Sequence, residues 1–361
     1  MKIVIDARFT RIDHHDGISR YGASLIAAVA RLSEVTMLIS DKRQLALLPD
    51  VPYQLIRSPL SPLELFVARS VNTLAPDVVF CPMQTMGSWG RKYALVLTLH
   101  DLIYYEHPAP PGFLPAPVRL LWRLYHKAYW PQRVLLNRAD MVATISRTTE
   151  SLIAKYRLTR RPVRIIGNAP QGDRVPRSPD SVPDKTLIYM GSFMPYKNVE
   201  TMIRGMEALP GFTLHLLSRV TPHRRAELEA VIPAGASVVF HNGVSDQEYD
   251  DLLLKATALV TLSRAEGYGL PLVEAMALGT PVIASDTPIF REVGGSAVSY
   301  VPAGSAAEFA AAVRALEDPL VWADCSRASV RQAETFNWDR SARELISIAT
   351  ELADRGANSA A

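Results

Sequence analysis

Short apolar runs alternate with amphipathic segments along most of this chain. Residues 1–6, 96–99, 187–191 and 259–262 are apolar runs, typical of strands that a parallel sheet buries on both faces. Polar loops and segments with helical periodicity follow them, such as residues 17–32. This order of strand, loop and helix predicts an α/β fold with parallel sheets.

The repeating pattern is interrupted once. Residues 167–184 are rich in Pro, Asp and Arg and have no apolar period, which is typical of an exposed linker. The length of 361 residues also exceeds what one hydrophobic core usually spans. We therefore expect two domains, residues 1–170 and residues 186–339, with residues 171–185 as the linker.

Charge is divided unevenly between the two halves. Residues 1–177 hold 24 Lys and Arg against 13 Asp and Glu, a net charge of +11, and the remaining 15 against 23 give −8, which together make the overall +3. Within the basic half, Arg119, Arg123 and Lys127 lie four positions apart among Leu, Trp and Tyr. This spacing fits an amphipathic helix at a membrane interface, and it fits equally a helix whose apolar face packs on the sheet. No nucleic-acid-binding module is recognisable, so nucleic acid is not expected as a partner.

Several classes of protein are disfavoured by what the sequence lacks. No run approaches the roughly twenty apolar residues that a membrane-spanning helix needs, and the chain begins with a strand rather than a signal peptide. Cys81 and Cys325 fall in different expected domains and form no metal-binding pattern, as expected for reduced thiols in a cytoplasmic protein. Nucleotide-sugar enzymes of the other main fold hold Mg²⁺ with an Asp-x-Asp element, and this sequence has no such element at a suitable place. We therefore expect neither a metal nor a cofactor.

The strongest chemical pattern lies in residues 264–277, where Glu266 and Glu274 flank a glycine-rich turn. Gly267 and Gly269 allow close backbone approach, and a helix over residues 270–278 would present free N–H groups and a positive dipole end to a phosphate. Carboxylates on either side of a phosphate make sense if each accepts hydrogen bonds from sugar hydroxyls. The plainer interpretation is a pair of solvated acids that complement the helix dipole.

Three further residues stand at the ends of predicted strands. Gly17 begins a helix after the first strand, and His100 ends the apolar run at 96–99. Both positions favour ligand contact in an α/β fold, although a turn glycine and a structural histidine are the plainer interpretations. Lys197 follows another strand, and Asn198 is expected to cap the next helix and so to fix Lys197 as a point charge for a diphosphate.

Together these segments resemble the retaining glycosyltransferases of family 4. The resemblance rests on Glu266, seven residues and Glu274 in a Gly-aromatic-Gly-Leu-Pro frame, and on the Pro-x-Lys-Asn, Gly-Ile-Ser-Arg-Tyr and His-Asp segments. It extends from Met1 to about Leu352 and implies the GT-B fold, in which two Rossmann-like domains face each other across a cleft. It also implies that a helix over about residues 340–354 packs back on the first domain.

Residue roles follow from the resemblance alone. It implies His100 and Glu266 as catalytic residues close to the transferred sugar. Arg20 and Arg264 become phosphate or acceptor contacts. It implies donor-binding roles for Gly17, Lys197, Gly267, Tyr268, Gly269, Leu270 and Glu274.

Two positions depart from the family pattern. Ser192 stands where many relatives carry Arg, so that Arg20, Arg219 or Arg264 would have to compensate for the missing cation. Ala169 follows Asn168 where Gly is commoner. Both departures keep a noncatalytic nucleotide-sugar-binding subunit among the alternatives.

The resemblance implies a retaining, metal-independent hexosyltransferase, most similar to bacterial mannosyltransferases of surface glycan assembly. GDP-mannose is the expected donor, and a lipid-linked or polysaccharide glycan the expected acceptor. In this family the N-terminal domain takes the acceptor. The basic first half therefore suggests an anionic acceptor or an anionic membrane surface, with the protein in the cytoplasm or at the inner face of the membrane. The alternatives are a UDP-sugar-dependent glucosyl or GlcNAc transferase or synthase, and an epimerase of the same fold.

Overall fold

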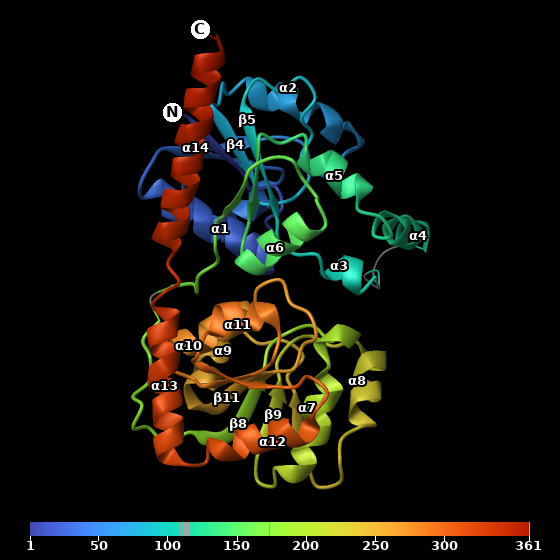
Figure 1. Ribbon diagram of the computed structural model, residues 1–361, viewed down its shortest axis with the longest axis vertical. Helices are drawn as coiled ribbons and strands as arrows, with labels where there is room; N and C mark the ends of the chain where they lie inside the picture. Colours follow the sequence, from blue (N-terminus) through green and yellow to red (C-terminus); the bar gives the residue numbers. More distant parts are fainter. Residues whose placement is uncertain (109, 111–115, 173, 361) are drawn as a thin grey trace. The chain divides into compact units, whose positions relative to one another are not determined.

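The computed structural model describes residues 1–108, 110, 116–172 and 174–360, and the chain divides into two compact units. Unit 1 comprises residues 1–168 and the chain from Asn337 onward, and unit 2 comprises residues 169–336. Each unit contains a parallel sheet flanked by helices (Figure 1). The predicted α/β fold class with two Rossmann-like domains is thereby confirmed.

Unit 1 is built on a seven-stranded sheet with the order β3-β2-β1-β4-β5-β6-β7, in which neighbouring strands are parallel. Its apolar strands are buried on both faces, as in Ile3, Val4 and Ile5, because helices cover both sides of the sheet. The elements of unit 1 are β1 Ile3–Asp6, α1 Gly17–Ala30, β2 Val35–Ile39, η1 Lys42–Leu47, β3 Tyr53–Leu55, η2 Pro62–Phe66, α2 Val67–Asn72, β4 Val78–Cys81, β5 Ala94–Leu99, α3 Ile103–Glu106, α4 Ala116–Tyr125, α5 Trp130–Leu136, β6 Met141–Thr144, α6 Arg147–Lys155, β7 Val163–Ile165 and α14 Trp338–Ala360.

The last helix, α14, completes unit 1 from the far end of the chain. It lies beside α1 (Figure 1) and buries an apolar stripe that includes Leu345, Ile348 and Leu352. Arg164 pairs with Glu344 at 2.6 Å on its polar side. Within the described residues, no helix combines the length and the apolar character that crossing a bilayer requires.

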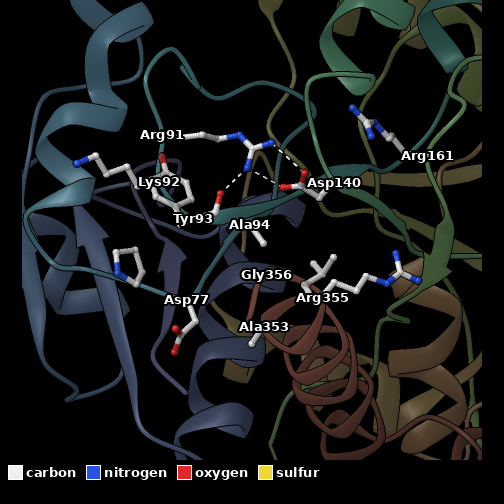
Figure 2. A pocket seen from close by; sticks show the side chains of 12 residues that line it. Asp77, Arg91, Lys92, Tyr93, Ala94, Asp140, Arg161, Ala353, Arg355 and Gly356 are labelled. Atoms are coloured by element: carbon white, nitrogen blue, oxygen red, sulfur yellow. Dashed lines mark hydrogen bonds and ion pairs between the residues drawn. The ribbon is translucent and has the colours of Figure 1, made fainter. Parts of the chain in front are cut away.

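A cavity of about 660 Å³ opens at the edge of the unit 1 sheet where the strands begin. Asp77, Ala94, Asp140 and Arg161 line it, and each stands at the amino-terminal end of a strand, while the end of α14 closes the other side (Figure 2). Parallel α/β sheets bind their ligands at the opposite, carboxyl-terminal edge. The cavity therefore does not coincide with the predicted site.

Unit 2 has a six-stranded parallel sheet with the order β10-β9-β8-β11-β12-β13. Its elements are β8 Asp184–Tyr189, η3 Pro195–Lys197, α7 Val199–Gly205, η4 Met206–Ala208, β9 Thr213–Leu216, α8 Pro222–Glu229, β10 Ser237–Phe240, α9 Asp246–Lys255, β11 Ala256–Thr261, α10 Leu270–Ala277, β12 Val282–Ser285, α11 Pro288–Gly294, β13 Val298–Val301, α12 Ala306–Ala315 and α13 Pro319–Ala333.

Both sheets reverse their strand order once, between β1 and β4 in unit 1 and between β8 and β11 in unit 2. At such a switch point the loops after the two central strands diverge to opposite faces and leave a crevice between them. This topology therefore predicts a ligand position in each unit at the carboxyl ends of these four strands.

The segment before β8 is less exposed than predicted. Arg177 donates its backbone N–H to Leu278 O at 3.0 Å, its guanidinium donates to Ala256 O at 3.0 Å, and it lies over the Trp322 ring at 4.5 Å. Arg174 is also buried, against α9 and α10. The prediction of an exposed linker is wrong for these arginines, because the guanidinium groups find carbonyl, carboxylate and aromatic partners on unit 2.

Candidate active site

The loop between β11 and α10 forms the glycine turn that the sequence predicts before a helix start. Gly269 is the N-cap of α10 with φ +99°, and a Cβ there would lie 2.9 Å from the Phe290 ring, so both conformation and packing require glycine. Pro271 has no N–H, and Leu272 N–H donates to Gly269 O at 2.9 Å. The amides of Gly269 and Leu270 are the remaining N–H groups at this helix start, where the dipole favours an anion.

Lys197 and Glu266 meet directly in unit 2. Lys197 Nζ lies 2.6 Å from Glu266 Oε1, and the two side chains are only 13% and 14% exposed. They are 69 residues apart in sequence, but they follow β8 and β11, the two strands at the switch point of the sheet. The site thus combines a cation suited to a diphosphate with a carboxylate suited to sugar hydroxyls.

Asn198 holds the Lys197 turn in place. Its backbone is left-handed, with φ 54°, and its side-chain amide donates to Leu262 O at 3.1 Å and to Ala303 O at 2.6 Å. The prediction that this side chain caps the backbone of α7 is wrong, because its Oδ1 accepts from the Thr201 hydroxyl at 2.8 Å instead of from a backbone N–H. Asn198 therefore connects the turn that carries Lys197 to the loop that leads to α10.

Glu274 lies deeper than the turn and belongs to a buried cluster. It is 5% exposed, and its Oε1 is 3.9 Å from Arg174 Nη2, which in turn lies 2.9 Å from Asp250 Oδ1. Burial and the nearby Glu274 carboxylate raise the pKa of the Tyr249 phenol well above its usual range. Arg174 thus carries the segment before β8 into contact with a predicted donor-binding residue.

His100 stands at the end of β5 in unit 1. Its Nε2 lies 2.7 Å from Pro82 O. A carbonyl oxygen only accepts, so Nε2 carries a proton, and in the neutral ring Nδ1 is left as an acceptor. Burial lowers the pKa of His100 below its ordinary value of 6.5, and the hydrogen bond to Pro82 opposes this only in part. The neutral ring can therefore accept a hydrogen bond from a sugar hydroxyl at neutral pH.

Gly17 and Arg20 occupy the first turn of α1, behind the N-cap Asp16. Asp16 Oδ1 accepts from Ser19 N–H at 2.9 Å. A Cβ on Gly17 would meet no atom within 4 Å, and its φ is not in the left-handed region. Neither packing nor conformation within unit 1 explains a glycine here, which favours a ligand as the reason.

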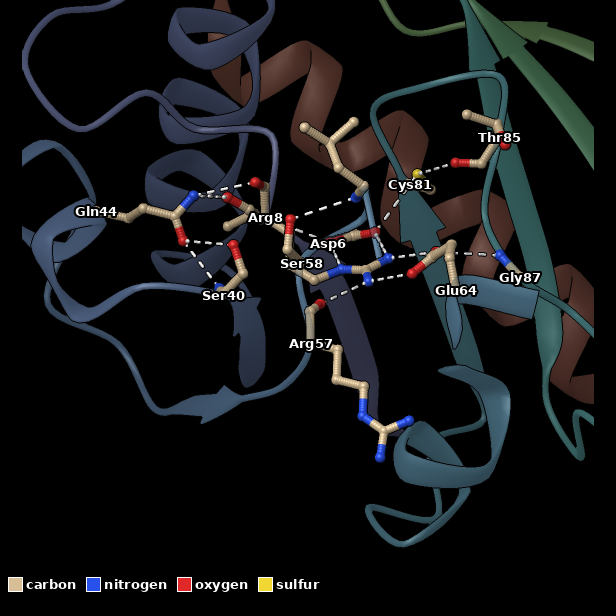
Figure 3. Close-up of polar contacts among 12 residues, drawn as sticks. Asp6, Arg8, Ser40, Gln44, Arg57, Ser58, Glu64, Cys81, Thr85 and Gly87 are labelled. Carbon is tan, nitrogen blue, oxygen red and sulfur yellow. Dashed lines mark hydrogen bonds and ion pairs between the residues drawn. The ribbon is translucent and has the colours of Figure 1, made fainter. Parts of the chain in front are cut away.

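A buried charge network fixes the loops around the β1 end. Arg8 forms paired hydrogen bonds with Asp6 (2.8 and 2.8 Å) and with Glu64 (2.7 and 2.9 Å), as Figure 3 shows. Burial by itself would lower the pKa of Arg8, and the two carboxylates outweigh it and raise the pKa. Burial and Asp6 also raise the pKa of the Cys81 thiol, so this thiol is a poor nucleophile.

Two family models match this chain. The model described as "Glycosyltransferase Family 4" matches residues 15–169, and the model described as "Glycosyl transferases group 1" matches residues 176–328. The matches together take in most of both units. The chain belongs to glycosyltransferase family 4.

Two relatives are glycosyltransferases by name, and a solved structure shares the GT-B fold. The O-antigen chain mannosyltransferase RfbU of Salmonella typhimurium is 23% identical over 83% of this chain and 87% of its own. The O-antigen chain mannosyltransferase B of Escherichia coli is 26% identical over 71% of this chain and 70% of its own. A structure of HepE from Anabaena, solved with UDP and glucose, matches 97% of this chain and 100% of its own with a TM-score of 0.72 at 18% identity.

In this family 4 glycosyltransferase, the predicted site residues lie at the carboxyl-terminal strand edges of the two units. Unit 1 holds Gly17, Arg20 and His100. In unit 2, Lys197 and Glu266 are in contact, and Arg264 is exposed. The remaining predicted donor residues of unit 2 are Gly267, Tyr268, Gly269, Leu270 and Glu274, of which Tyr268 is buried and packs edge-on against Phe336.

Some structural residues of the site were not predicted. Arg224 donates to Phe193 O at 3.0 Å, next to Ser192, but Glu200 and Glu227 already pair with its guanidinium. Arg174 stood in a stretch that looked like a linker, so only its charge singled it out. No three His, Cys, Asp or Glu side chains group as metal ligands in the part of the chain that the structure describes.

Proposed function

We propose that this protein is a retaining hexosyltransferase that moves mannose from GDP-mannose to a hydroxyl of a lipid-linked or polysaccharide acceptor. The acceptor oxygen bonds to the anomeric carbon while the bond from that carbon to the diphosphate oxygen breaks on the same face of the sugar. The acceptor proton passes to the departing diphosphate oxygen. No metal and no covalent sugar–enzyme intermediate enter this scheme.

Six of the predicted residues have a defined part in this proposed reaction. Lys197 and the amides of Gly269 and Leu270 would stabilise the charge that develops on the departing diphosphate. Glu266 would accept hydrogen bonds from the sugar, and Glu274 from the ribose. The neutral ring of His100 would accept, at Nδ1, a hydrogen bond from a hydroxyl of the transferred sugar.

One observation carries this proposal above the others: the Lys197–Glu266 ion pair of 2.6 Å at the switch point between β8 and β11, where β11 also leads into the glycine turn of α10. A buried ion pair contributes little to stability by itself, so a ligand role accounts for it better than a structural role. The mannosyl part rests on the two O-antigen mannosyltransferase relatives. We also propose a cytoplasmic location, which the free thiols of Cys81 and Cys325 support.

A UDP-sugar donor is the second candidate. It is favoured by the structural similarity to HepE, which was solved with UDP and glucose. The two candidates differ in the base and the sugar that the site holds, and they share the same diphosphate chemistry.

Thermal shift measurements with GDP-mannose, UDP-glucose and UDP-GlcNAc, each with and without EDTA, separate these candidates. A donor at about 100 times its Kd should stabilise the folded protein by about 2.7 kcal/mol. We expect the largest shift with GDP-mannose, unchanged by EDTA. A larger shift with a UDP-sugar would reject the GDP-mannose donor, loss of the shift in EDTA would reject metal independence, and no shift with any of them would reject the proposal.

Variants then test the ion pair itself. Glu266→Gln and Lys197→Met should each lower kcat by about 100-fold or more, since one lost electrostatic contact typically costs that much. The matched control is Lys185→Met with Glu317→Gln, an exposed pair of 2.7 Å in the same unit. Full turnover by Glu266→Gln would reject the proposed role of Glu266, whereas a wild type that binds a donor but turns none over would favour a noncatalytic binding subunit.

A further inference from the structure

Helix α4 turns an apolar face outward. Leu120, Leu121 and Leu124 are 58%, 66% and 53% exposed, and Val118 and Trp130 nearby in sequence are exposed as well. At about 100° per residue, the three leucines fall on one side of the helix. The sequence left open whether this helix packs its apolar face on the sheet, and the exposed leucines exclude that interpretation.

Aromatic side chains anchor the opposite side of α4. The Trp122 ring packs edge-on against Tyr104 of α3 at 4.8 Å, and His126 packs against Tyr105 at 5.1 Å. The Tyr125 hydroxyl donates to Gln132 Oε1 at 2.9 Å. These contacts fix which side of the helix faces the protein, so the leucines cannot turn inward without breaking them.

Positive charge surrounds the exposed leucines. Arg119 and Arg123 lie on one flank of the helix, and Lys127 follows it. Residues 107–139 contain five Lys and Arg and no Asp or Glu. Unit 1 as a whole has 25 Lys and Arg against 16 Asp and Glu, a net charge of +9, whereas unit 2 has 14 against 20, a net charge of −6, which together make +3.

An anionic lipid surface binds exposed apolar side chains that have cations beside them. The leucines of α4 and the neighbouring Arg side chains provide both features, with no acidic residue between them in the sequence. The apolar side chains enter the boundary between headgroups and acyl chains, and each nearby Lys or Arg gains about 1 kcal/mol from the negative surface potential. A partner protein would need acidic side chains around an apolar groove. A second copy of this chain does not offer such acidic side chains at this stretch, because the charged residues of the stretch are all basic and would repel those of the other copy.

We infer that the outward face of α4, formed by Leu120, Leu121 and Leu124 with Arg119 and Arg123, docks unit 1 on an anionic phospholipid surface. This inference deepens the proposed function by naming the surface at which the protein would meet a lipid-linked acceptor. Only this biological purpose of the docking rests on the proposed function. The interaction itself requires no donor.

Co-sedimentation with vesicles tests the inference on the full chain. Vesicles of phosphatidylcholine alone are compared with vesicles of phosphatidylcholine mixed with phosphatidylglycerol. We expect binding to the mixed vesicles only, at least about tenfold weaker for Leu120→Gln/Leu121→Gln/Leu124→Gln and for Arg119→Gln/Arg123→Gln. Added salt should weaken the binding of the wild type, because surface charge is screened.

Matched controls lie on exposed positions of unit 2. Leu320→Gln removes a leucine that is 76% exposed, and Arg204→Gln/Arg331→Gln removes two exposed cations. Both should bind vesicles as the wild type does. Glutamine preserves helix propensity, and an unchanged thermal shift with GDP-mannose shows that a variant is folded and that its donor site is intact.

The inference is overturned if the leucine variant binds mixed vesicles like the wild type, or if the wild type ignores phosphatidylglycerol. It is also overturned if sedimentation velocity finds a wild-type dimer that the leucine variant loses, since the face would then pair with a second copy. Vesicle binding without any donor-induced thermal shift would leave this inference standing and reject the proposed function alone.

Discussion

A single carbonyl oxygen determines the hydrogen-bonding role of His100. Because Nε2 faces Pro82 O at 2.7 Å, the ring must carry its proton on that nitrogen, and the other nitrogen is left for a ligand. The same arrangement would fail on protonation, because Nδ1 would become a donor. The residue is thus a hydrogen-bond acceptor only while it is neutral.

His100 therefore makes stability and activity depend on pH. Its folded pKa lies below 6.5, so the unfolded chain binds more protons as the pH falls through 6.5, and stability is lost in that direction. His100→Gln should reduce the fall in unfolding free energy between about pH 7.5 and about pH 5.5, measured by urea denaturation. The transfer rate of the wild type is expected to fall below pH 6.5, and that of His100→Gln should not show this fall.

The matched control for this prediction is His14→Gln, at an exposed side chain of the same unit. It should leave the pH dependence of stability as in the wild type. His126 and His215, whose pKa values burial also lowers, keep part of the wild-type slope in every variant. An unchanged slope in His100→Gln would show that the ring is not held neutral by the fold.

Gly17 offers a way to separate ligand contact from folding at one residue. Gly17→Ala places a methyl group where unit 1 has no atom within 4 Å, so the melting temperature should stay the same or rise. Transfer activity should fall about tenfold or more, because the family resemblance places the donor diphosphate against this backbone.

Gly22→Ala on the same helix is the comparison for Gly17→Ala. Its new Cβ would lie 3.9 Å from Pro82, an ordinary contact, and Gly to Ala within a helix gains roughly 0.5–1 kcal/mol. Gly22→Ala should raise stability and keep activity. If Gly17→Ala also keeps full activity, Gly17 is an ordinary turn residue.

At the scale of the element, the start of α10 is defined by backbone conformation rather than by a side-chain cap. Gly269→Ala should lower the unfolding free energy by about 1–2 kcal/mol for the left-handed backbone alone, and by more for the contact with Phe290. Gly235→Ala separates the two effects, because Gly235 also has a positive φ, of 79°, but open space around its Cβ position. Urea denaturation of both variants gives the difference, and equal losses would mean that Phe290 yields without cost.

The elements were largely predictable from apolar periodicity. The strand at residues 259–262 and the helix at residues 17–32 correspond to β11 and α1 with shifts of a few residues at their ends. Periodicity suffices there because parallel strands are buried on both faces and α1 on one. The outward face of α4 was not predictable, because a leucine stripe has the same sequence pattern whether it packs on a sheet or is exposed to solvent.

The candidate site was predictable only in part for a related reason. The glycine turn before α10 is local, so its residues could be found from spacing. The contact between Lys197 and Glu266 depends on β8 and β11 being neighbours in the sheet, which the order of the sequence does not specify. The link from Arg174 to Glu274 depends on a segment that has no regular structure, so no periodicity marks it.

At the scale of the whole molecule, unit 2 is one continuous stretch of chain with its own sheet and core. A protein of residues 169–336 alone should therefore fold cooperatively and bind GDP, since Lys197 and the amides of Gly269 and Leu270 all lie within it. Circular dichroism melting with and without GDP measures both properties. A Lys197→Met version of the same fragment is the control, and it should melt cooperatively but gain less from GDP.

Failure of this fragment to fold would show that unit 2 depends on unit 1 for its stability. A fragment that folds but ignores GDP, UDP and their sugars would instead show that the donor contacts of unit 2 are insufficient. The complementary chain of residues 1–336 should keep the unit 2 transition and lose that of unit 1, because it lacks α14.

The position of α14 has a consequence for synthesis on the ribosome. Because unit 2 is inserted between the two parts of unit 1, the ribosome completes the inserted unit while the earlier one still lacks its last helix. The apolar surface of α1 that α14 covers stays open throughout that interval. The nascent chain thus exposes the apolar surface of an incomplete domain while unit 2, residues 169–336, is translated. We expect the dependence of folding on chaperones to increase with the length of this delay.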